Sequence, residues 1–270
     1  MNIFPALTES AFIHVREQIH SIVKIIGKVR ETLITPIAKN DNLWISVVGQ
    51  GVCTPPMPLY GELEVGLNLE SLRVELANAT EKYDSIEVNG LTQQKIAEEL
   101  NSKLTDFGVA VPIDINGFDY TKVYTIHPDE AKGFLTQLTN YNTLLTEFHK
   151  RISGGVKTQI CLWPHHFDNA FKWFSGRRIA DEEEQMGIGV SNGDESYELP
   201  YIYMSLYPSL RKTNTLEFSE GALLHDTDWQ GFILPYETVS EKKTVEEQRK
   251  LIEDFFDISF KSIQRGFSKR

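Results

Sequence analysis

The sequence predicts an α+β fold in which an antiparallel β-sheet packs against long α-helices. Long segments carry apolar residues at spacings of three and four, which is typical of amphipathic helices. Shorter segments alternate polar and apolar residues, which is typical of antiparallel strands with one wet face. The 270 residues are 41% hydrophobic and 24% charged, a composition that ordinary globular proteins share.

The first half of the chain is expected to run from a helix through several strands to a second helix. The apolar residues from Phe12 to Leu33 share one helical face, and Pro36 ends that helix. Strict alternation predicts a hairpin further on. The expected elements are a helix over 10–33, strands over 43–48, 62–70, 72–76 and 83–88, a helix over 91–107 and an irregular connector over 108–127.

The second half repeats that order. Pro128 opens a long helix with acidic residues in its first turn, and Gly154 and Gly155 end it. Next come strands over 156–163, 200–207, 221–224 and 231–236, with a long insertion after the first of them, and a helix over 245–263.

This repetition suggests an internal duplication. We expect a single compact unit over 1–270, made of halves 1–110 and 128–270 whose structures superpose. The alternative is coincidence, because α+β proteins have few possible element orders and the two halves share few identical residues.

Charge and cysteine content exclude several function classes. The 38 acidic residues against 27 basic ones give a net charge of −11, which argues against nucleic acid and an anionic membrane surface as partners. Cys53 and Cys161 show no disulfide-framework or metal-binding spacing, so we expect two reduced thiols. The chain shows no basic leader and no apolar run long enough for a membrane span, so we expect a cytoplasmic protein of bacterial type.

The segment LWPHHFD directly follows a predicted strand. If that strand continues, His166 and Asp168 lie on one face and His165 on the other. A histidine and a carboxylate so placed can act as two metal ligands, or as a base and the group that orients it. The alternative is a hydrogen-bonded polar pair at the end of a strand.

The segment from Gly189 to Gly193 fits the pattern G-x-S-x-G of a nucleophile elbow, with Ser191 at its centre. An elbow needs a strand before it and a helix after it. Here an acidic run precedes the segment and a strand follows, so a serine hydrolase is disfavoured. A glycine-rich turn that delivers Asp194 and Glu195 to the next strand is the favoured interpretation.

Several of these segments together resemble known sequences. LWPHHFD, GVSNGDE and PYIYM resemble segments of an uncharacterised group of bacterial proteins. FDNAFKWFSGR, FILPYETV and the early IIGKVRETL are similar, more distantly, to a bacterial domain-of-unknown-function family, number 5996, over most of the chain. The residues that match the group's pattern are His166, Asp168, Ser191, Asp194 and Glu195.

The departures from these patterns are few. His165 stands where the group often has an acid, and Cys161 and Pro164 stand where the family has histidine and tryptophan. No activity is assigned to either group, so the resemblance implies membership and no particular chemistry.

Three weaker candidates complete the set. Trp163 and the aromatic residues after it belong either to the core or to a ligand pocket. Arg177 either binds an anion or pairs with the acidic run that follows it. The segment containing His225 and Asp228 is typical of an aspartate-rich turn.

Two function classes stay open. The first is a small-molecule enzyme, with metal-assisted hydrolysis as one form and a divalent ion as its cofactor. Its candidate catalytic or metal-ligating residues are His166, Asp168, Asp194 and Glu195, and its candidate ligand-binding residues are Trp163, His165, Ser191 and Arg177. The second is a non-catalytic module that binds a ligand or assembles into a homo-oligomer.

The first class carries a spatial expectation. If strands 156–163 and 200–207 pair antiparallel, Asp194 or Glu195 lies near His166 and Asp168 in one open, polar cleft.

Overall fold

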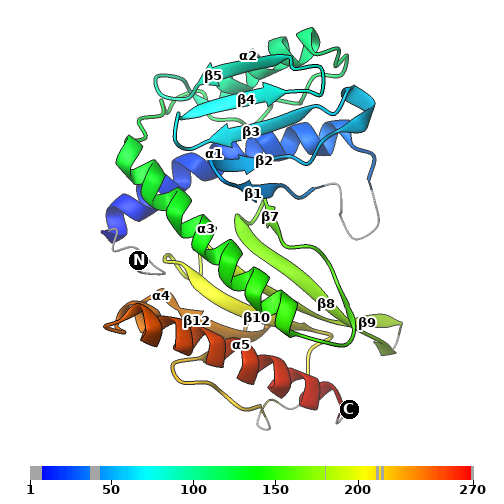
Figure 1. Ribbon diagram of the computed structural model, residues 1–270, viewed down its shortest axis with the longest axis vertical. Helices are drawn as coiled ribbons and strands as arrows, with labels where there is room; N and C mark the ends of the chain where they lie inside the picture. The colour runs from blue at the N-terminus through cyan, green and yellow to red at the C-terminus, as the bar shows by residue number, and fades with distance from the viewer. Residues whose placement is uncertain (1–7, 37–42, 180, 211–212, 214–215, 269–270) are drawn as a thin grey trace. The chain divides into compact units, whose positions relative to one another are not determined.

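The computed structural model describes residues 8–36, 43–179, 181–210, 213 and 216–268, and it has the expected α+β architecture (Figure 1). Residues 1–7, on which part of the leader expectation depends, lie outside the described residues. The helices are α1 (Glu9–Leu33), α2 (Gln93–Asp106), α3 (Pro128–Arg151), α4 (Tyr236–Ser240) and α5 (Val245–Ser268). The strands are β1 (Ser46–Val48), β2 (Gly51–Cys53), β3 (Glu64–Asn68), β4 (Arg73–Ala77), β5 (Tyr83–Glu87), β6 (Val156–Lys157), β7 (Cys161–Trp163), β8 (Asp168–Ile179), β9 (Glu182–Ser191), β10 (Tyr201–Tyr207), β11 (Leu223–Asp226) and β12 (Gln230–Pro235).

The chain divides into two units. Among the described residues, the N-terminal unit comprises 8–139 and Cys161–Phe167, and the C-terminal unit comprises Asn140–Ile160 and 168–268. These boundaries differ from the expected halves, because α3 contributes residues to both units and the connector over 108–127 belongs to the first. That the whole chain forms one compact body stays a prediction.

The N-terminal unit is built on a sheet with strands in the order β1-β2-β3-β4-β5, all antiparallel. The predicted hairpin is confirmed as β3 and β4, in which Val65 lies opposite Leu76 and Leu67 opposite Val74. All four side chains are buried. The apolar stripe of α1 packs against this sheet and against α2, which accounts for the helical spacing of its apolar residues.

The segment Cys161–Phe167 belongs to the N-terminal unit, and we call it the docking segment. Leu162 exchanges two backbone hydrogen bonds with Ile45, of 2.8 and 2.9 Å. The ring of His20 on α1 donates from Nε2 to the carbonyl of Pro164 at 2.9 Å. The same ring stacks on Phe167 with centroids 4.7 Å apart. The apolar residues of LWPHHFD therefore attach a distant piece of chain to α1.

The C-terminal unit contains the larger sheet, whose strands run in the order β11-β12-β10-β9-β8-β6. One face of β8, β9, β10 and β12 packs on α5 and on the second half of α3. Buried aromatic rings dominate this core, and Phe148 stacks on Phe256 with centroids 4.6 Å apart. Figure 1 shows α5 running along this sheet.

The prediction of a long insertion after the strand over 156–163 is wrong. Residues 168–179 and 182–191 form the hairpin of β8 and β9, the longest two strands described. β8 shows no clean alternation, since Ala170 and Phe174 are buried as well as Asn169, Phe171 and Trp173. In β9, Gly187 and Gly189 weaken the strand pattern, because glycine usually marks a turn or a break in a strand.

The expected superposition of the halves is not supported by the strand order. The first sheet follows the chain from β1 to β5, whereas in the second sheet β12 lies between β10 and β11. The segments at 62–76 are adjacent strands, and those at 200–224 are not. The shared order of helix, strands and helix therefore does not extend to a shared topology.

We predict that Gly27→Ala destabilises the protein. A Cβ added at Gly27 would lie 2.5 Å from Cβ of Pro164, so α1 and the docking segment would have to separate. Overpacking of this kind costs about 1–3 kcal/mol, more than the gain of about 1 kcal/mol from replacing a helical glycine. Urea denaturation followed by circular dichroism measures the change, and Gly49→Ala is the control because nothing lies within 4 Å there. Equal stability of the two variants would contradict the prediction.

We also predict that His20 makes stability depend on pH. Burial, together with the nearby Lys24, lowers the pKa of His20 from 6.5 to about 4. Between these values the unfolded chain binds more protons than the folded chain, so stability falls as the pH drops from 6.5 towards 4. The slope approaches about 1.4 kcal/mol per pH unit.

In His20→Gln this component of the slope disappears, and denaturation curves at pH 7, 6 and 5 (about one-unit steps across the window) measure it. The control is His14→Gln, an exposed histidine on the same helix. If the wild type and His20→Gln have parallel stability profiles, His20 is not the group responsible.

Candidate functional site

The two faces of the C-terminal sheet differ sharply in chemistry. Along β10, Ile202, Met204 and Leu206 are buried in the core against α5 and its neighbours. Tyr201 and Tyr203 alternate with them and therefore lie on the opposite face. The register places Asp168 and Tyr201 on either side of Ser191 in one row across three strands.

The tyrosine hydroxyls on this opposite face donate to carboxylates. Tyr201 donates to Oδ2 of Asp194 at 2.5 Å, and Tyr203 donates to Oδ2 of Asp168. Burial raises the pKa of Tyr201, and the bond to Asp194 raises it further. Both phenols therefore serve as donors that hold charged side chains on a sheet surface.

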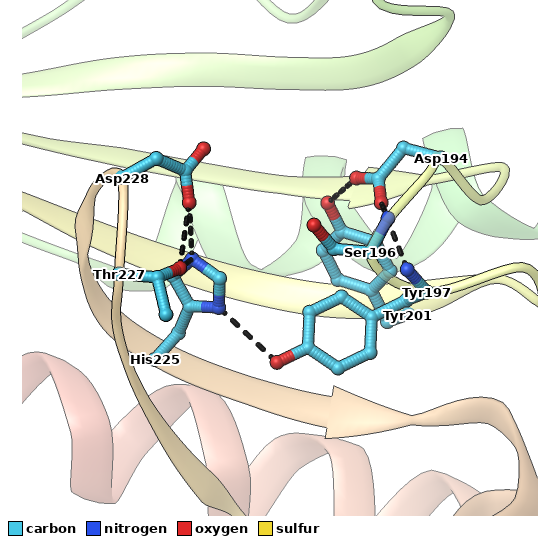
Figure 2. A network of polar contacts seen from close by, with 7 residues as sticks. All are labelled: Asp194, Ser196, Tyr197, Tyr201, His225, Thr227 and Asp228. Atoms are coloured by element: carbon cyan, nitrogen blue, oxygen red, sulfur yellow. Dashed lines mark hydrogen bonds and ion pairs between the residues drawn. The ribbon is translucent and has the colours of Figure 1, made fainter.

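Asp194 is also fixed by the backbone. Its Oδ1 accepts from the amides of Ser196 and Tyr197 at 2.8 and 2.9 Å, so the loop between β9 and β10 closes on this one side chain. The loop then presents Tyr197 beside Tyr201, with ring centroids 5.1 Å apart. Figure 2 shows this arrangement.

Glycines in β9 make room for side chains of β10. A Cβ at Gly189 would lie 2.8 Å from Cζ of Tyr203, and one at Gly187 would lie 2.6 Å from Oγ of Ser205. A side chain at either position would displace its neighbour, so the ring of Tyr203 packs directly on the backbone of β9.

A second network centres on His225, which is only 4% exposed. Its Nδ1 lies 3.1 Å from the hydroxyl of Tyr197, and its Nε2 lies 2.8 Å from Oδ1 of Asp228. Thr227 donates to the same carboxylate oxygen at 2.8 Å. The three side chains Tyr197, His225 and Asp228 thus form a continuous hydrogen-bonded chain (Figure 2).

The charge on Asp228 determines which ring nitrogen of His225 carries a proton. His225 and Thr227 lower the pKa of Asp228 by hydrogen bonding, so near neutral pH this group is charged and can only accept. Nε2 of His225 therefore carries a proton, and in a neutral ring Nδ1 accepts from Tyr197. The ring is held in place by stacking on Trp229, with centroids 4.1 Å apart.

These residues form one surface, which we call the tyrosine face. Ring contacts run from Tyr197 to Tyr201 and Tyr203, and from Tyr203 and His225 to Trp229. Its members are Asp168, Asp194, Tyr197, Tyr201, Tyr203, His225, Asp228 and Trp229. All of them belong to the C-terminal unit.

The structure brings some predicted site residues together. Asp168, Ser191 and Asp194 lie around Tyr201, and both aspartates contribute to its raised pKa. Ser191 is buried and accepts from the amide of Gly193. The element after Ser191 is the strand β10, in agreement with the argument against a nucleophile elbow.

Other predicted residues lie elsewhere. His165 and His166 are exposed in a turn over 164–167, so the strand that would have aligned His166 with Asp168 is interrupted. Trp163 and both histidines belong to the docking segment of the N-terminal unit, and a site that joins them to Asp168 stays a prediction. Glu195 is exposed in the loop before β10.

The expected pairing of strands 156–163 and 200–207 is wrong. β10 pairs with β9 and β12 instead, because the overlooked hairpin supplies its neighbour. Asp168 and Asp194 nevertheless lie on the same side of the sheet, since they accept from Tyr203 and Tyr201, which share one face of β10.

Arg177 forms an ion pair within the chain, which is the second of the two interpretations that its sequence allowed. Its Nε and Nη2 both donate to Oε1 of Glu184, at 3.1 and 2.7 Å. Glu184 belongs to the acidic run that follows Arg177 in the sequence.

Metal binding finds no support in the geometry. Among the residues that the structure describes, no group of three or more histidine, cysteine, aspartate or glutamate side chains is arranged to hold an ion. Both cysteines are free, as expected. Burial raises the pKa of Cys53 to about 12, so its thiol is a poor nucleophile or metal ligand at neutral pH.

Sequence reasoning missed the aromatic members of the site. Tyr197 and Trp229 were not candidates, Tyr203 entered only through the resemblance of PYIYM, and His225 was interpreted as part of a turn. The available signal was the period of two in PYIYMSLY, which places tyrosines on one face of a strand and apolar residues on the other.

Comparisons with known proteins give one match. A family model described as "Family of unknown function (DUF5996)" matches residues 4–265. No curated protein and no solved structure matches the sequence. Across the described residues, no helix is both long and apolar enough to cross a membrane.

We predict that Tyr201→Phe lowers the free energy of unfolding by about 1 kcal/mol, the net value of one hydrogen bond. The buried ring stays, but the bond that holds Asp194 and its loop is lost. Tyr207→Phe is the matched control, because this exposed tyrosine on the same strand also donates to a carboxylate, that of Glu182. It should change stability by less than about 0.5 kcal/mol. Chemical denaturation compares them, and an equal loss in both would show that the Asp194 bond has no special weight.

Proposed function

Since the chain belongs to the DUF5996 family, whose function is unknown, we propose a function from its geometry. We infer that the protein is an enzyme that acts on a small molecule by general acid–base catalysis at the tyrosine face. The phenol of Tyr197 is the group that exchanges a proton with the substrate.

The observation that carries this proposal is the chain from Tyr197 through His225 to Asp228. When the phenol oxygen takes a proton from the substrate, its own proton passes to Nδ1 of His225. The imidazolium that forms is stabilised by the carboxylate on its other nitrogen. Asp228 acts through the histidine and is a positioning residue.

The surroundings favour a neutral or positively charged substrate. Tyr197, Tyr203 and Trp229 are each half-buried, so part of every ring is open to a ligand. Exposed ring faces attract flat molecules and cations. The carboxylates of Asp168, Asp194 and Asp228 disfavour an anion at the same surface.

Of the two function classes, we propose the small-molecule enzyme. We assign it no metal ion, because the described residues offer no cluster of metal ligands. A small-molecule ligand is the expected partner. We also propose a cytoplasmic location, which the two free cysteines support.

The test is a substrate screen followed by substitution. Purified protein is incubated with pooled small metabolites, and compounds that are consumed or produced are identified by mass spectrometry. We predict that Tyr197→Phe and His225→Gln slow the turnover of any such compound by about 100-fold or more, the usual contribution of one acid–base group. Tyr207→Phe should leave the rate unchanged.

A second measurement does not require a substrate. The ¹⁵N chemical shifts of the His225 ring should report a protonated Nε2 and an accepting Nδ1, and the Nδ1 shift should move in Tyr197→Phe. Turnover that survives in both Tyr197→Phe and His225→Gln would overturn the proposal. So would a screen in which no compound is converted.

A further inference from the structure

An open cavity of about 570 Å³ lies within the C-terminal unit. The β8 and β9 hairpin forms one of its walls, and the last turns of α5 form the other. Its volume is within the range of small-molecule sites. None of its lining residues belongs to the tyrosine face, so a ligand of this cavity does not depend on the proposed function.

The accessible charged groups of this cavity are all cations. Arg177, Lys261 and Arg265 line it, and all three are exposed. Glu184 is the one carboxylate among the described lining residues, and its side chain is 0% exposed. A cavity lined by cations attracts anions, even though the chain as a whole has a net charge of −11.

An irregularity in the hairpin places Arg177 on the cavity wall. The register of β8 against β9 shifts at this point, where residues 175–177 lie opposite Glu184 alone. Gly176 has a φ of 82°, a left-handed conformation that glycine adopts without strain. Bulges of this kind re-aim side chains and are frequent beside functional sites.

The buried Glu184 fixes the guanidinium of Arg177. Nε and Nη2 both donate to Oε1 of Glu184, at 3.1 and 2.7 Å, so one edge of the group is held in place. A guanidinium has further N–H donors, and those of Arg177 have no partner among the described residues. The side chain is 52% exposed, so these outer donors are accessible to an anion.

The wall formed by α5 supplies two more cations. Lys261 and Arg265 are four positions apart, so they lie on the same face of the helix. Lys261 has no ion-pair partner in the described part of the chain, whereas Arg265 donates from Nη1 to Glu217 at 2.5 Å. Both members of that pair are more than half exposed. An exposed pair contributes little to stability, so Arg265 can also bind a ligand.

We propose that this cavity binds a small molecule that carries two phosphate groups. One phosphate accepts from Lys261 and Arg265 on α5, and the other accepts from the outer donors of Arg177 on the opposite wall. A phosphate group carries a charge of about −1.5 to −2 and several acceptor oxygens, which suits the adjacent cations of α5 better than a carboxylate would. A ligand with a single anionic group could engage only one of the two walls.

The experiment measures binding of four probes to the full chain by calorimetry at constant ionic strength. The probes are a hexose bisphosphate, the corresponding hexose monophosphate, pyrophosphate and inorganic phosphate. We expect at least one of the two-phosphate probes to bind about tenfold or more tightly than its one-phosphate counterpart, because it makes charged contacts with both walls. The tighter of the two shows whether the phosphates of the natural ligand are joined directly or lie at opposite ends.

Substitutions then locate the site. Lys261→Gln should weaken binding of the tighter probe by about tenfold or more. Arg177→Gln combined with Glu184→Gln should do the same, and it removes the buried ion pair as a whole, so that no buried charge is left unpaired. The control is Lys250→Gln, because this lysine of α5 lies outside the cavity and pairs with Asp254. Its affinity for the probe should equal that of the wild type.

Three outcomes would overturn the proposal. One is that neither two-phosphate probe binds more tightly than its one-phosphate counterpart. Another is that Lys261→Gln binds the tighter probe as well as the wild type does; Lys261 is exposed, so this variant folds even if the double substitution disturbs the hairpin. The third is that succinate, a dicarboxylate, binds as tightly as the better two-phosphate probe, since the cavity would then not select phosphate.

Discussion

The strict alternation of side chains along β10 is the constraint on which the rest of the C-terminal unit depends. Ile202, Met204 and Leu206 must face the core, so Tyr201 and Tyr203 must face away from it. The ring of Tyr203 lies across Gly189 of β9, where a Cβ would clash with it. The carboxylates of Asp168 and Asp194 accept the hydrogen bonds of the two phenols.

The same alternation organises the hydrogen-bonded chain through His225. β12 lies between β10 and β11, and His225 lies opposite Gly231, which is opposite Ser205. Gly231 also leaves room for a ring. A Cβ added at Gly231 would lie 2.9 Å from Cζ3 of Trp229. The arrangement that orients the histidine is thus a consequence of strand register and of glycine placement.

The docking segment shows how a sequence motif can mislead. Adjacent histidines beside an aspartate suggest chemistry, yet the buried residues of LWPHHFD are Leu162, Pro164 and Phe167. Leu162 pairs with Ile45, and Pro164 and Phe167 contact α1, while both histidines stay exposed. The histidine that does carry a strongly lowered pKa, His20, lies within the predicted helix over 10–33 and outside every motif. Its burial depends on Phe167, which is far away in sequence.

Much of the fold could be predicted because the signals are local. Helical spacing identified α1, α2, α3 and α5, and alternation identified β3 and β4, since each element must bury one face regardless of its partner. The hairpin of β8 and β9 was missed because its glycines are explained only by rings on β10.

The candidate site divides in the same way. Asp168, Ser191 and Asp194 were candidates from the sequence alone, because short polar motifs at strand ends are visible without a structure; their functional role stays a prediction. Tyr197 and His225 were not, because the hydrogen bond between them joins a loop to a strand 28 residues later. The sequence by itself determined the fold class, the apolar faces and the free thiols. Only the tertiary structure decided which strand lies beside which, and hence which tyrosine meets which acid, because register is set by packing between segments that are distant in the chain.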